Sequence, residues 1–389
     1  MRKGWEYKKL GEVCCPKSKI QRATKCFGGS DEILYIDISS IDNSVQEVNS
    51  ITSFTMSNAP SRAQQKVEYG DIIVSTVRPN LKNVAFIKQH DSNLVVSSGF
   101  CVLRTTDDIE RNYLFRYITS DIFTQHLMKL TTGANYPAVR DLDVRDSTIP
   151  LPPKSTQIEI VSELDKINEL IRLKKEQLKD FDNLAQSLFY EMFGDPVENE
   201  KGWEVKKLGE IAKSAIGLTY KPENVTEELS GTVVLRSSNI QNSILDFNDI
   251  VRVNVLVKED KMVNDGDILM CSRNGSFRLV GKVALIKGLK ERMSYGAFMT
   301  IIRSPYNPYL FEYFKTPAFR QYLITGKTTT VNQITVKMLN NLTLPLPPLP
   351  LQRLFAQRIE QIEREKSEVQ KSIQDLETLL ASRMQYWFE

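Results

Sequence analysis

Residues 156–193 read TQIEIVSELDKINELIRLKKEQLKDFDNLAQSLFYEMF, and their pattern decides the fold. Apolar side chains recur every seven residues in two interleaved series, which together form one stripe along a helix. The first series is Leu164, Ile171, Leu178, Ala185 and Met192, and the second is Ile160, Ile167, Phe181 and Leu188. A heptad pattern sustained over about five repeats predicts a coiled-coil seam rather than a helix lying on a globular core.

Local signals set the ends of this helix. Thr156 followed by Glu159 predicts a capping box, and Gly194 with Pro196 beyond it predicts a stop. The helix is therefore expected at about residues 157–193, a rod of roughly 55 Å at about 1.5 Å per residue. A rod of that length is too long for one small domain to enclose.

A second copy of this pattern lies 195 residues later (359 − 164 = 195). Its seam consists of Ile359, Ile373 and Leu380 with Phe355, Ile362, Val369 and Leu376, while the remaining seam positions hold Lys366, Arg383 and Trp387. The prolines before the helix also recur, as IPLPP at 149–153 and LPLPP at 344–348. The opening motif recurs as GWEYKKLGE at 4–12 and GWEVKKLGE at 202–210. Matches in the same order along both halves indicate two tandem copies of one module.

Each copy divides into a mixed body and a helical tail. Short β-rich runs alternate with helical stretches, such as 111–130 and 308–324, so each body is expected to be a compact α+β domain. If the two tail helices close on each other antiparallel, the bodies lie at opposite ends and a pseudo-twofold axis relates the copies. We predict two α+β bodies at 1–154 and 195–349, and long coiled-coil helices at 155–194 and 350–389.

The composition excludes several classes of protein. The 389 residues include 51 Lys plus Arg against 48 Asp plus Glu, with 41% apolar and 25% charged residues, which is typical of a globular protein. The sequence has no run of about 18 apolar residues, and its N-terminus lacks the apolar core of a signal peptide. A cytoplasmic protein without membrane contact is expected.

Metal and catalytic sites are not predicted. The chain has only two histidines, and no Cys-x-x-Cys spacing occurs among its five cysteines, Cys14, Cys15, Cys26, Cys101 and Cys271, so free thiols are expected. The stretch Gly326-Lys327-Thr328 lacks the leading glycine of a phosphate-binding loop. Asn307-Pro308-Tyr309 lacks the second proline of an amino-methyltransferase pocket. We predict that the chain is not itself an enzyme.

Two similar modules held at a fixed spacing suit duplex DNA, where paired readers select two half-sites a set number of base pairs apart. The motifs carry a family resemblance as well. The repeated GWxxxKLGE opening, the Pro-Leu-Pro-Pro break followed by Gln157 or Gln352, and the long helix that ends each copy resemble the specificity subunit of a type I restriction–modification enzyme. The resemblance covers essentially the whole chain. It departs at Thr156 and Leu351, where many members carry Glu.

The resemblance implies a function and a set of partners. Two target recognition domains would each read one half of a split sequence in double-stranded DNA. The two helices would form the spacer and dock two adenine-N6 methyltransferase subunits, and restriction subunits with motor and nuclease activity would join for cleavage. The resemblance also implies that this chain binds no cofactor, and that S-adenosylmethionine, ATP and Mg²⁺ belong to the partner subunits.

Loops of the two bodies contain the candidate DNA contacts. Arg and Asn side chains that follow the repeated Gly-Asp strands could bridge phosphates or read guanine and adenine edges, and solvated surface turns are the alternative. Arg236 joins them because the first copy has Asp37 at that place. The candidates are Arg78, Asn80, Asn135, Tyr136, Arg140, Arg236, Arg273, Asn274, Lys327 and Asn332.

The alternative function is a structural adaptor whose coiled coil holds two protein-binding modules and binds no DNA. The two functions differ in the salt dependence of binding to random duplex, because phosphate contacts release counterions. Within the seam, Lys174 and Lys366 either form a polar layer that sets helix register or extend to solvent beside it.

Overall fold

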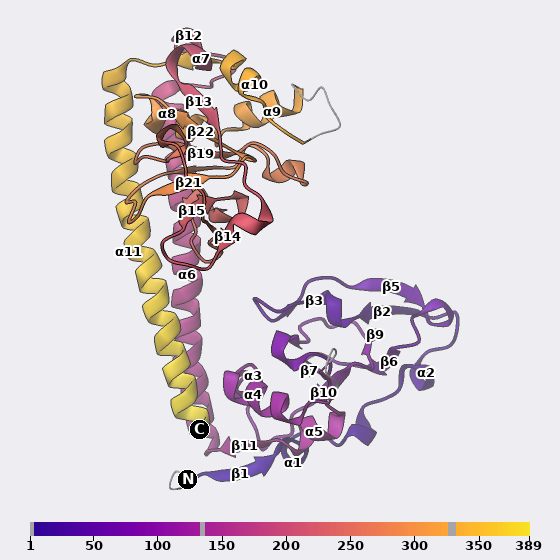
Figure 1. Ribbon diagram of the computed structural model, residues 1–389. Coiled ribbons are helices and arrows are strands. Elements are labelled where there is room, and N and C mark those ends of the chain that lie inside the picture. The colour runs from indigo at the N-terminus through magenta and orange to yellow at the C-terminus, as the bar shows by residue number, and fades with distance from the viewer. Residues whose placement is uncertain (1–3, 133–136, 326–331) are drawn as a thin grey trace. The chain divides into compact units, whose positions relative to one another are not determined.

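The computed structural model describes residues 4–132, 137–325 and 332–389 (Figure 1). The chain divides into two compact units, which are unit 1 (Met1–Lys175 and Lys371–Glu389) and unit 2 (Glu176–Gln370). Each unit contains one body of mixed helices and strands, the first part of one 40-residue helix and the last part of the other. The predicted α+β class with two long helices is confirmed.

Unit 1 builds its body from small sheets. Strand β1 (Glu6–Lys9) pairs antiparallel with β11 (Thr148–Leu151), which closes the body next to the long helix. An antiparallel sheet has the order β10-β7-β8, and a mixed sheet has the order β5-β2-β9-β6 with β2 and β9 parallel. The other strands are β2 (Glu32–Ile36), β3 (Ile41–Asp42), β4 (Glu47–Val48), β5 (Thr52–Thr55), β6 (Ala63–Lys66), β7 (Ile72–Ser75), β8 (Val84–Phe86), β9 (Leu94–Ser97) and β10 (Phe100–Leu103). The helices are α1 (Leu10–Val13), α2 (Ala23–Cys26), α3 (Arg111–Ile118), α4 (Asp121–Leu130), α5 (Asp141–Asp146) and α6 (Lys154–Phe193).

Unit 2 repeats this plan. Strand β12 (Glu204–Lys207) pairs with β23 (Thr343–Leu346), and parallel strands β15 and β21 correspond to β2 and β9. The sheet orders are β13-β22-β19-β20 and β14-β18-β15-β21. The first of these sheets corresponds to the sheet β10-β7-β8 of unit 1 and has β13 as an additional strand. The other strands are β13 (Lys213–Ile216), β14 (Val225–Thr226), β15 (Thr232–Leu235), β16 (Ile240–Gln241), β17 (Ile244–Leu245), β18 (Arg252–Val253), β19 (Ile268–Cys271), β20 (Val283–Leu285), β21 (Met293–Tyr295) and β22 (Met299–Arg303). The helices are α7 (Leu208–Ile211), α8 (Asn307–Tyr313), α9 (Pro317–Thr325), α10 (Val336–Asn341) and α11 (Leu349–Phe388).

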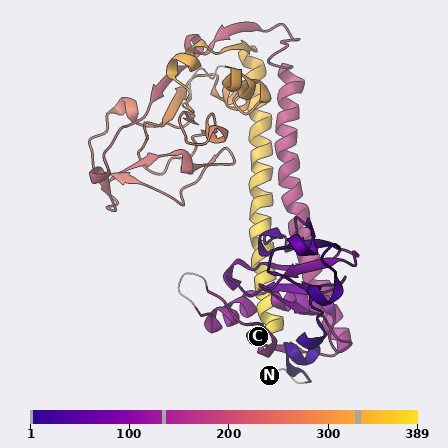
Figure 2. The ribbon, with the colours of Figure 1, turned by 90° about the vertical axis from the view of Figure 1, so that its right-hand side faces the viewer.

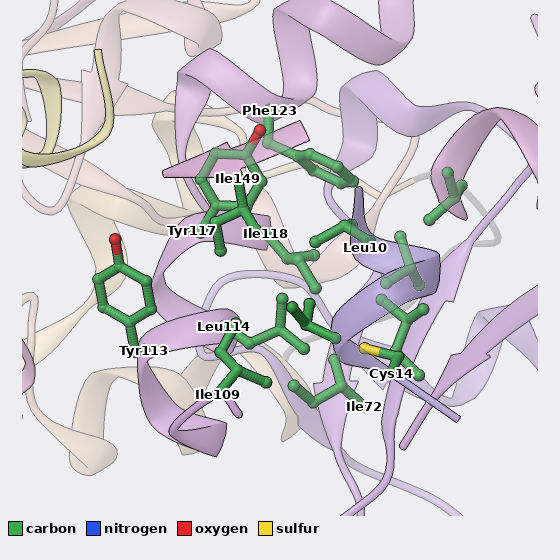
Figure 3. Packing of buried hydrophobic residues seen from close by; sticks show 14 of the residues in the cluster. Leu10, Cys14, Ile72, Ile109, Tyr113, Leu114, Tyr117, Ile118, Phe123 and Ile149 are labelled. Atoms are coloured by element: carbon green, nitrogen blue, oxygen red, sulfur yellow. The ribbon is translucent and has the colours of Figure 1, made fainter. Parts of the chain in front are cut away.

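The central strand of each body is buried on both faces. Because side chains alternate along a strand, Ile72 and Val74 of β7 face the helical layer while Ile73 faces the second sheet. Figure 3 shows the helical side of this core, where Ile72, Leu10 and Leu114 come from three different elements. Strand β19 divides its residues between two clusters in the same way. Each body is therefore a layer of strands between helices and a second sheet.

The two long helices run antiparallel in unit 1. Glu163 of α6 binds Arg383 of α11. Further along α6, Lys175 pairs with Glu377 at 2.8 Å, so residue numbers rise along one helix while they fall along the other. Figure 1 shows the start of α6 beside the end of α11. The predicted pairing of antiparallel helices is present here.

Unit 2 contains the other half of the pairing, with the same polarity. Lys366 of α11 donates to Asp182 of α6 at 2.8 Å, and the rings of Phe189 and Phe355 lie 6.0 Å apart. Lys366 also pairs with Glu363 of its own helix, and its side chain is 19% exposed. Its partner across the seam is thus a carboxylate. Figure 2 shows the end of α6 and the start of α11 side by side.

The structure places the predicted seam residues on the inner faces of the helices. Seven are buried, namely Leu164, Ile167, Ile171, Leu188, Ile362, Val369 and Ile373. Five are partly exposed, namely Leu178, Phe181, Ile359, Leu376 and Leu380. Within unit 1, Ile160 and Leu164 also belong to the core of the body, so the helix is part of the body as well as of the seam.

The end of each long helix is an aromatic plug in a body. Phe388, at the end of α11, is 4% exposed, and the centroid of its ring lies 5.4 Å from that of Tyr113 in unit 1. Phe193, at the end of α6, is 2% exposed and lies 5.0 Å from Tyr309 in unit 2. The tryptophan of each opening motif contacts the same helix end: the Trp5 and Trp387 rings stack with centroids 6.2 Å apart, and the Trp203 indole donates to the Phe193 carbonyl. Each body is thus completed by the helix that belongs to the other copy.

A buried glutamine explains the residue that follows each proline-rich break. The Gln157 amide donates to the Pro152 carbonyl at 2.9 Å and accepts from the Glu110 N–H at 2.7 Å. Gln352 donates to the Pro347 carbonyl at 2.6 Å, but its amide oxygen has no partner among the described residues. The glutamine therefore ties the start of the long helix to the chain entering it, and in unit 1 also to α3.

Replacing Gln157 with alanine is expected to destabilise unit 1 by about 2–4 kcal/mol, because it leaves two buried backbone groups without a partner. Gln352→Ala is the matched variant, with an expected loss of about 1–2 kcal/mol, because only one bond is removed. Hydrogen exchange of the Glu110 amide measures the first change directly. If Gln157→Ala lowers protection in unit 1 no more than Gln352→Ala lowers it in unit 2, the second hydrogen bond of Gln157 does not contribute to stability.

Several predicted boundaries differ from the structure. The predicted cap at Thr156, with the helix starting at about Gln157, is wrong, because α6 begins at Lys154 directly after the two prolines and Thr156 lies inside the helix. The predicted helical stretch 111–130 is two helices, since the Ser120 hydroxyl caps α4 by accepting from the Phe123 N–H. In the second copy, α8 and α9 are likewise separate.

Candidate nucleic-acid interface

Three loops of unit 2 converge beside the end of β19. The N–H groups of Ser272 and Arg273 both donate to the Phe298 carbonyl in the β21–β22 turn, at 2.9 and 3.1 Å. The Ile334 N–H, in the segment before α10, donates to the Ser272 carbonyl at 2.7 Å. The Asn274 N–H donates to the Asn332 carbonyl at 3.3 Å. These bonds bring together the candidates Arg273, Asn274 and Asn332, which are up to 59 residues apart (332 − 273 = 59).

The corresponding loops of unit 1 converge in the same way. The Thr76 N–H donates to the Gly99 carbonyl at 2.8 Å, and the Val139 N–H donates to the Thr76 carbonyl at 2.9 Å. The Arg78 N–H donates to the Pro137 carbonyl at 2.7 Å. We call this arrangement the loop triad; in unit 1 it comprises 76–80, 97–99 and 137–140, and in unit 2 it comprises 272–276, 296–298 and 332–334. The candidates Asn135, Tyr136 and Lys327 lie outside the described residues.

The unit 1 candidates differ in their surroundings. Arg78 and Asn80 are exposed, and Arg78 adopts a left-handed backbone with φ of +50°. Arg140 is exposed too, but its guanidinium binds Asp143 at 2.6 Å while the Asp143 carboxylate accepts from the Arg140 N–H at 2.7 Å. Charge-assisted hydrogen bonds from Arg140 lower the pKa of Asp143. In this state Asp143 holds Arg140 at the N-cap position of its own helix, α5.

Two amide candidates in unit 2 hold the loops in place. The Asn274 side chain donates to the Ser237 hydroxyl at 3.3 Å and accepts from the Ser276 N–H at 3.0 Å. The Asn332 side chain donates to the Gly275 carbonyl at 2.9 Å. These side chains fix the shape of the loop triad, and the serine contact joins it to the turn that follows β15.

Arg236 belongs to that neighbouring turn. Its guanidinium pairs with Asp249 at 2.8 Å, and its side chain is 34% exposed. The corresponding Asp37 of unit 1 accepts from the Ile38 N–H at 2.8 Å, which is a cap of its own turn. The difference between the copies at this place therefore changes both the charge and the local contacts beside the triad.

A basic cleft in unit 1 was missed by the sequence reasoning. It has a volume of about 530 Å³, and Ser98, at the β9–β10 turn of the triad, contributes to its wall. Lys17, Arg22 and Lys25 line it, and none of the described residues lining it is acidic. Lys17 also lies 3.3 Å from Asp141. The signal was present in the sequence, because residues 16–27 read PKSKIQRATKCF, with four cations and no carboxylate.

The cysteines Cys14 and Cys271 are buried free thiols. Burial raises the pKa of Cys14 to about 12 and raises the pKa of Cys271, so these thiols are neutral near pH 7. Across the described part of the chain, no three His, Cys, Asp or Glu residues are grouped to hold a metal ion. None of the helices described has the length and apolar character needed to cross a membrane.

Comparisons with known proteins agree with this plan. The family model described as "Type I restriction modification DNA specificity domain" matches the chain twice, at residues 2–180 and 200–378. The specificity subunit of the type I restriction enzyme MjaIX of Methanocaldococcus jannaschii is 22% identical over 326 residues, which cover 79% of this chain and 74% of that one. The EcoKI specificity subunit of Escherichia coli K12 is 27% identical over 167 residues, 41% of this chain and 36% of that one. A solved structure described as "Structural basis underlying complex assembly and conformational transition of the type I R-M system" is 28% identical, with a TM-score of 0.70 over 100% of this chain and 98% of the other.

Proposed function

The chain belongs to the family of type I restriction modification DNA specificity domains, and from this we propose that it reads a split sequence in double-stranded DNA. It is a specificity subunit with two target recognition domains, one in each unit. The observation that carries the proposal is the loop triad, which has the same backbone framework in both bodies and different side chains on it. A shared frame with different side chains suits two readers of two different half-sites.

The contacts divide by chemistry. In unit 1 the basic cleft holds phosphates, because three cations line it and none of the described lining residues opposes them. Arg78 and Asn80, exposed on the triad, meet base edges. In unit 2 Arg273 takes this role, while Asn274 and Asn332 hold the loops that present it.

The partners follow from the family. The chain docks two methyltransferase subunits, and restriction subunits join that complex for cleavage. S-adenosylmethionine, ATP and Mg²⁺ are bound by those partners, and this chain performs no chemistry of its own. The purified chain is accordingly expected to transfer no methyl groups.

Mapping methylated adenines in DNA exposed to the assembled complex tests the proposal. The expected result is one split motif with one modified adenine in each half. Binding of the purified chain to random duplex adds an independent readout, because phosphate contacts make affinity fall steeply with salt. A chain without duplex affinity at low salt would be an adaptor for proteins instead.

Replacing Lys17, Arg22 and Lys25 together with alanine is expected to reduce the slope of log affinity against log salt by about 2 to 3, since each lost phosphate contact removes about 0.9. The loss should be similar for all duplex sequences, because phosphate contacts carry no base information. The matched control replaces Lys166, Lys179 and Lys371, three exposed lysines of the long helices, which removes the same charge. Equal slopes for the two triple variants would contradict a phosphate site in the cleft.

A further inference from the structure

An exposed aromatic ring sits on the loop triad of unit 2. The Phe298 side chain is 58% exposed at the turn between β21 and β22, where a large apolar group is costly to leave in water. The backbone beneath it is held on two sides. Its carbonyl accepts from two N–H groups of the β19 loop, and the Met299 N–H closes the turn on the Gly296 carbonyl at 2.8 Å. The ring is therefore presented by a fixed loop.

A cation lies next to the ring. The Arg273 guanidinium is centred 5.3 Å from the centroid of the Phe298 ring, a cation–π contact, and Arg273 is itself exposed. Asn274 and Asn332 support the same loop from the other side. The surface thus combines an exposed aromatic ring, a guanidinium and a loop fixed by hydrogen bonds. This combination matches the chemistry of proteins that insert a side chain between stacked bases.

Building on the proposed function, we propose that Phe298 inserts at one base step of the half-site that unit 2 reads, with Arg273 in the adjoining groove. Insertion buries the exposed ring against base faces. It unstacks and bends the duplex at that step, and sequences with flexible steps are favoured because they deform at lower cost. Phe298 is in this way a specificity-determining residue, because it selects DNA sequences by how easily their base steps deform.

Unit 1 has no such ring at the corresponding place. Gly99 accepts the hydrogen bond from Thr76 that corresponds to the bond from Ser272 to Phe298, and Val77 stands where unit 2 has Arg273. A Cβ atom on Gly99 would come within 2.8 Å of the Ile38 side chain, so even alanine requires Ile38 to shift. The distortion is therefore expected in one half-site only.

The test uses the assembled methyltransferase complex and its mapped duplex, with 2-aminopurine placed in turn at each position of both half-sites except the two methylated adenines and their neighbours, because a methyltransferase extrudes its target base by itself. The wild-type complex is expected to raise the fluorescence at one step of one half-site. Phe298→Ala should abolish this rise and weaken binding by about tenfold or more, while Phe298→Trp should retain both. Leu256→Ala is the matched control, since this side chain is 99% exposed in the same unit, and it should leave both readouts unchanged.

Two outcomes overturn the inference while the proposed function stands. One is a wild-type complex that binds its mapped site without a fluorescence rise at any step, and the other is a Phe298→Ala complex that keeps the rise and the affinity. A wild-type complex that binds no duplex contradicts the proposed function itself. Methylation by the Phe298→Ala complex at the unit 1 half-site shows that the variant is folded.

Discussion

Replacing Phe388 with alanine is expected to destabilise unit 1 by about 3–5 kcal/mol and to leave unit 2 unchanged. Phe388 belongs to the second copy of the module, but its ring fills the core of the first body, in unit 1. It is 4% exposed, with its centroid 5.4 Å from Tyr113 and 5.5 Å from Tyr117. Truncation to alanine leaves a cavity beside α3. The end of α11 should then separate from the body.

The matched variant Phe193→Ala is expected to destabilise unit 2 by about 3–5 kcal/mol and to leave the stability of unit 1 unchanged. Its ring lies 4.9 Å from Phe355 and 5.0 Å from Tyr309. Both variants remove the same group from equivalent places, because their numbers differ by 195 (388 − 193). Comparing them separates a local effect from a general one.

Hydrogen exchange measures both variants, because a chain of two units does not unfold in one step and a single melting midpoint would mix them. Protection should fall in α3 and α4 for Phe388→Ala, and in α8 and α9 for Phe193→Ala. Leu379→Ala, in the same helix as Phe388, is the control, since its side chain is 46% exposed and the expected change is within about 0.5 kcal/mol. Loss of protection in both units from either variant would show that the plugs are not confined to one body.

Replacing Asp71 with alanine is expected to destabilise unit 1 by about 3 kcal/mol, because it leaves the Arg104 guanidinium without its buried partner. The Asp71 carboxylate is 1% exposed and accepts two bonds from Arg104, both at 2.8 Å. It also accepts from the Glu68 N–H at 2.9 Å, which closes the turn around Gly70. The Arg104 side chain is 26% exposed and also reaches Glu68 at 3.2 Å, which keeps the loss near the low end for a buried pair.

A double variant distinguishes the charge from the packing. Replacing Asp71 with Leu and Arg104 with Met removes both charges, and it should cost less than Asp71→Ala alone because no charge is left buried without a partner. Protection of β7 and β10 amides measures both variants. If the double variant is less stable than the single one, the ion pair itself holds the two strands together. The pair of Asp267 and Arg303 allows the same comparison in unit 2.

The long helices and the repeat could be predicted because both are periodic. Leu164 and Ile171 belong to the seam by spacing alone, and the copy at Ile359 follows by offset. The helix start was predicted less well. Thr156 has the side chain of a cap, yet Gln157 forms buried bonds to Pro152 and Glu110 that hold an earlier start. Long-range contacts of that kind have no local signature.

The DNA-facing candidates show the same division. Arg78 and Arg273 could be selected because each follows a repeated Gly-Asp strand. The basic cleft could have been found from the cations of residues 16–27, but its connection to the triad through Ser98 depends on folding. Phe298 is not among the DNA-contact candidates predicted from the sequence, because a Phe at the start of a strand is usually a core residue and its exposure is a tertiary property.

The sequence alone determined the duplicated module, the helical seam and the family resemblance, since each rests on residue types at regular intervals along the chain. Only the tertiary structure decided which body receives each helix end, which loops meet in the triad, and which of the candidate side chains remain exposed there. Those features depend on contacts between residues tens to hundreds of positions apart, whose partners are chosen by how the whole core packs rather than by any neighbouring residue.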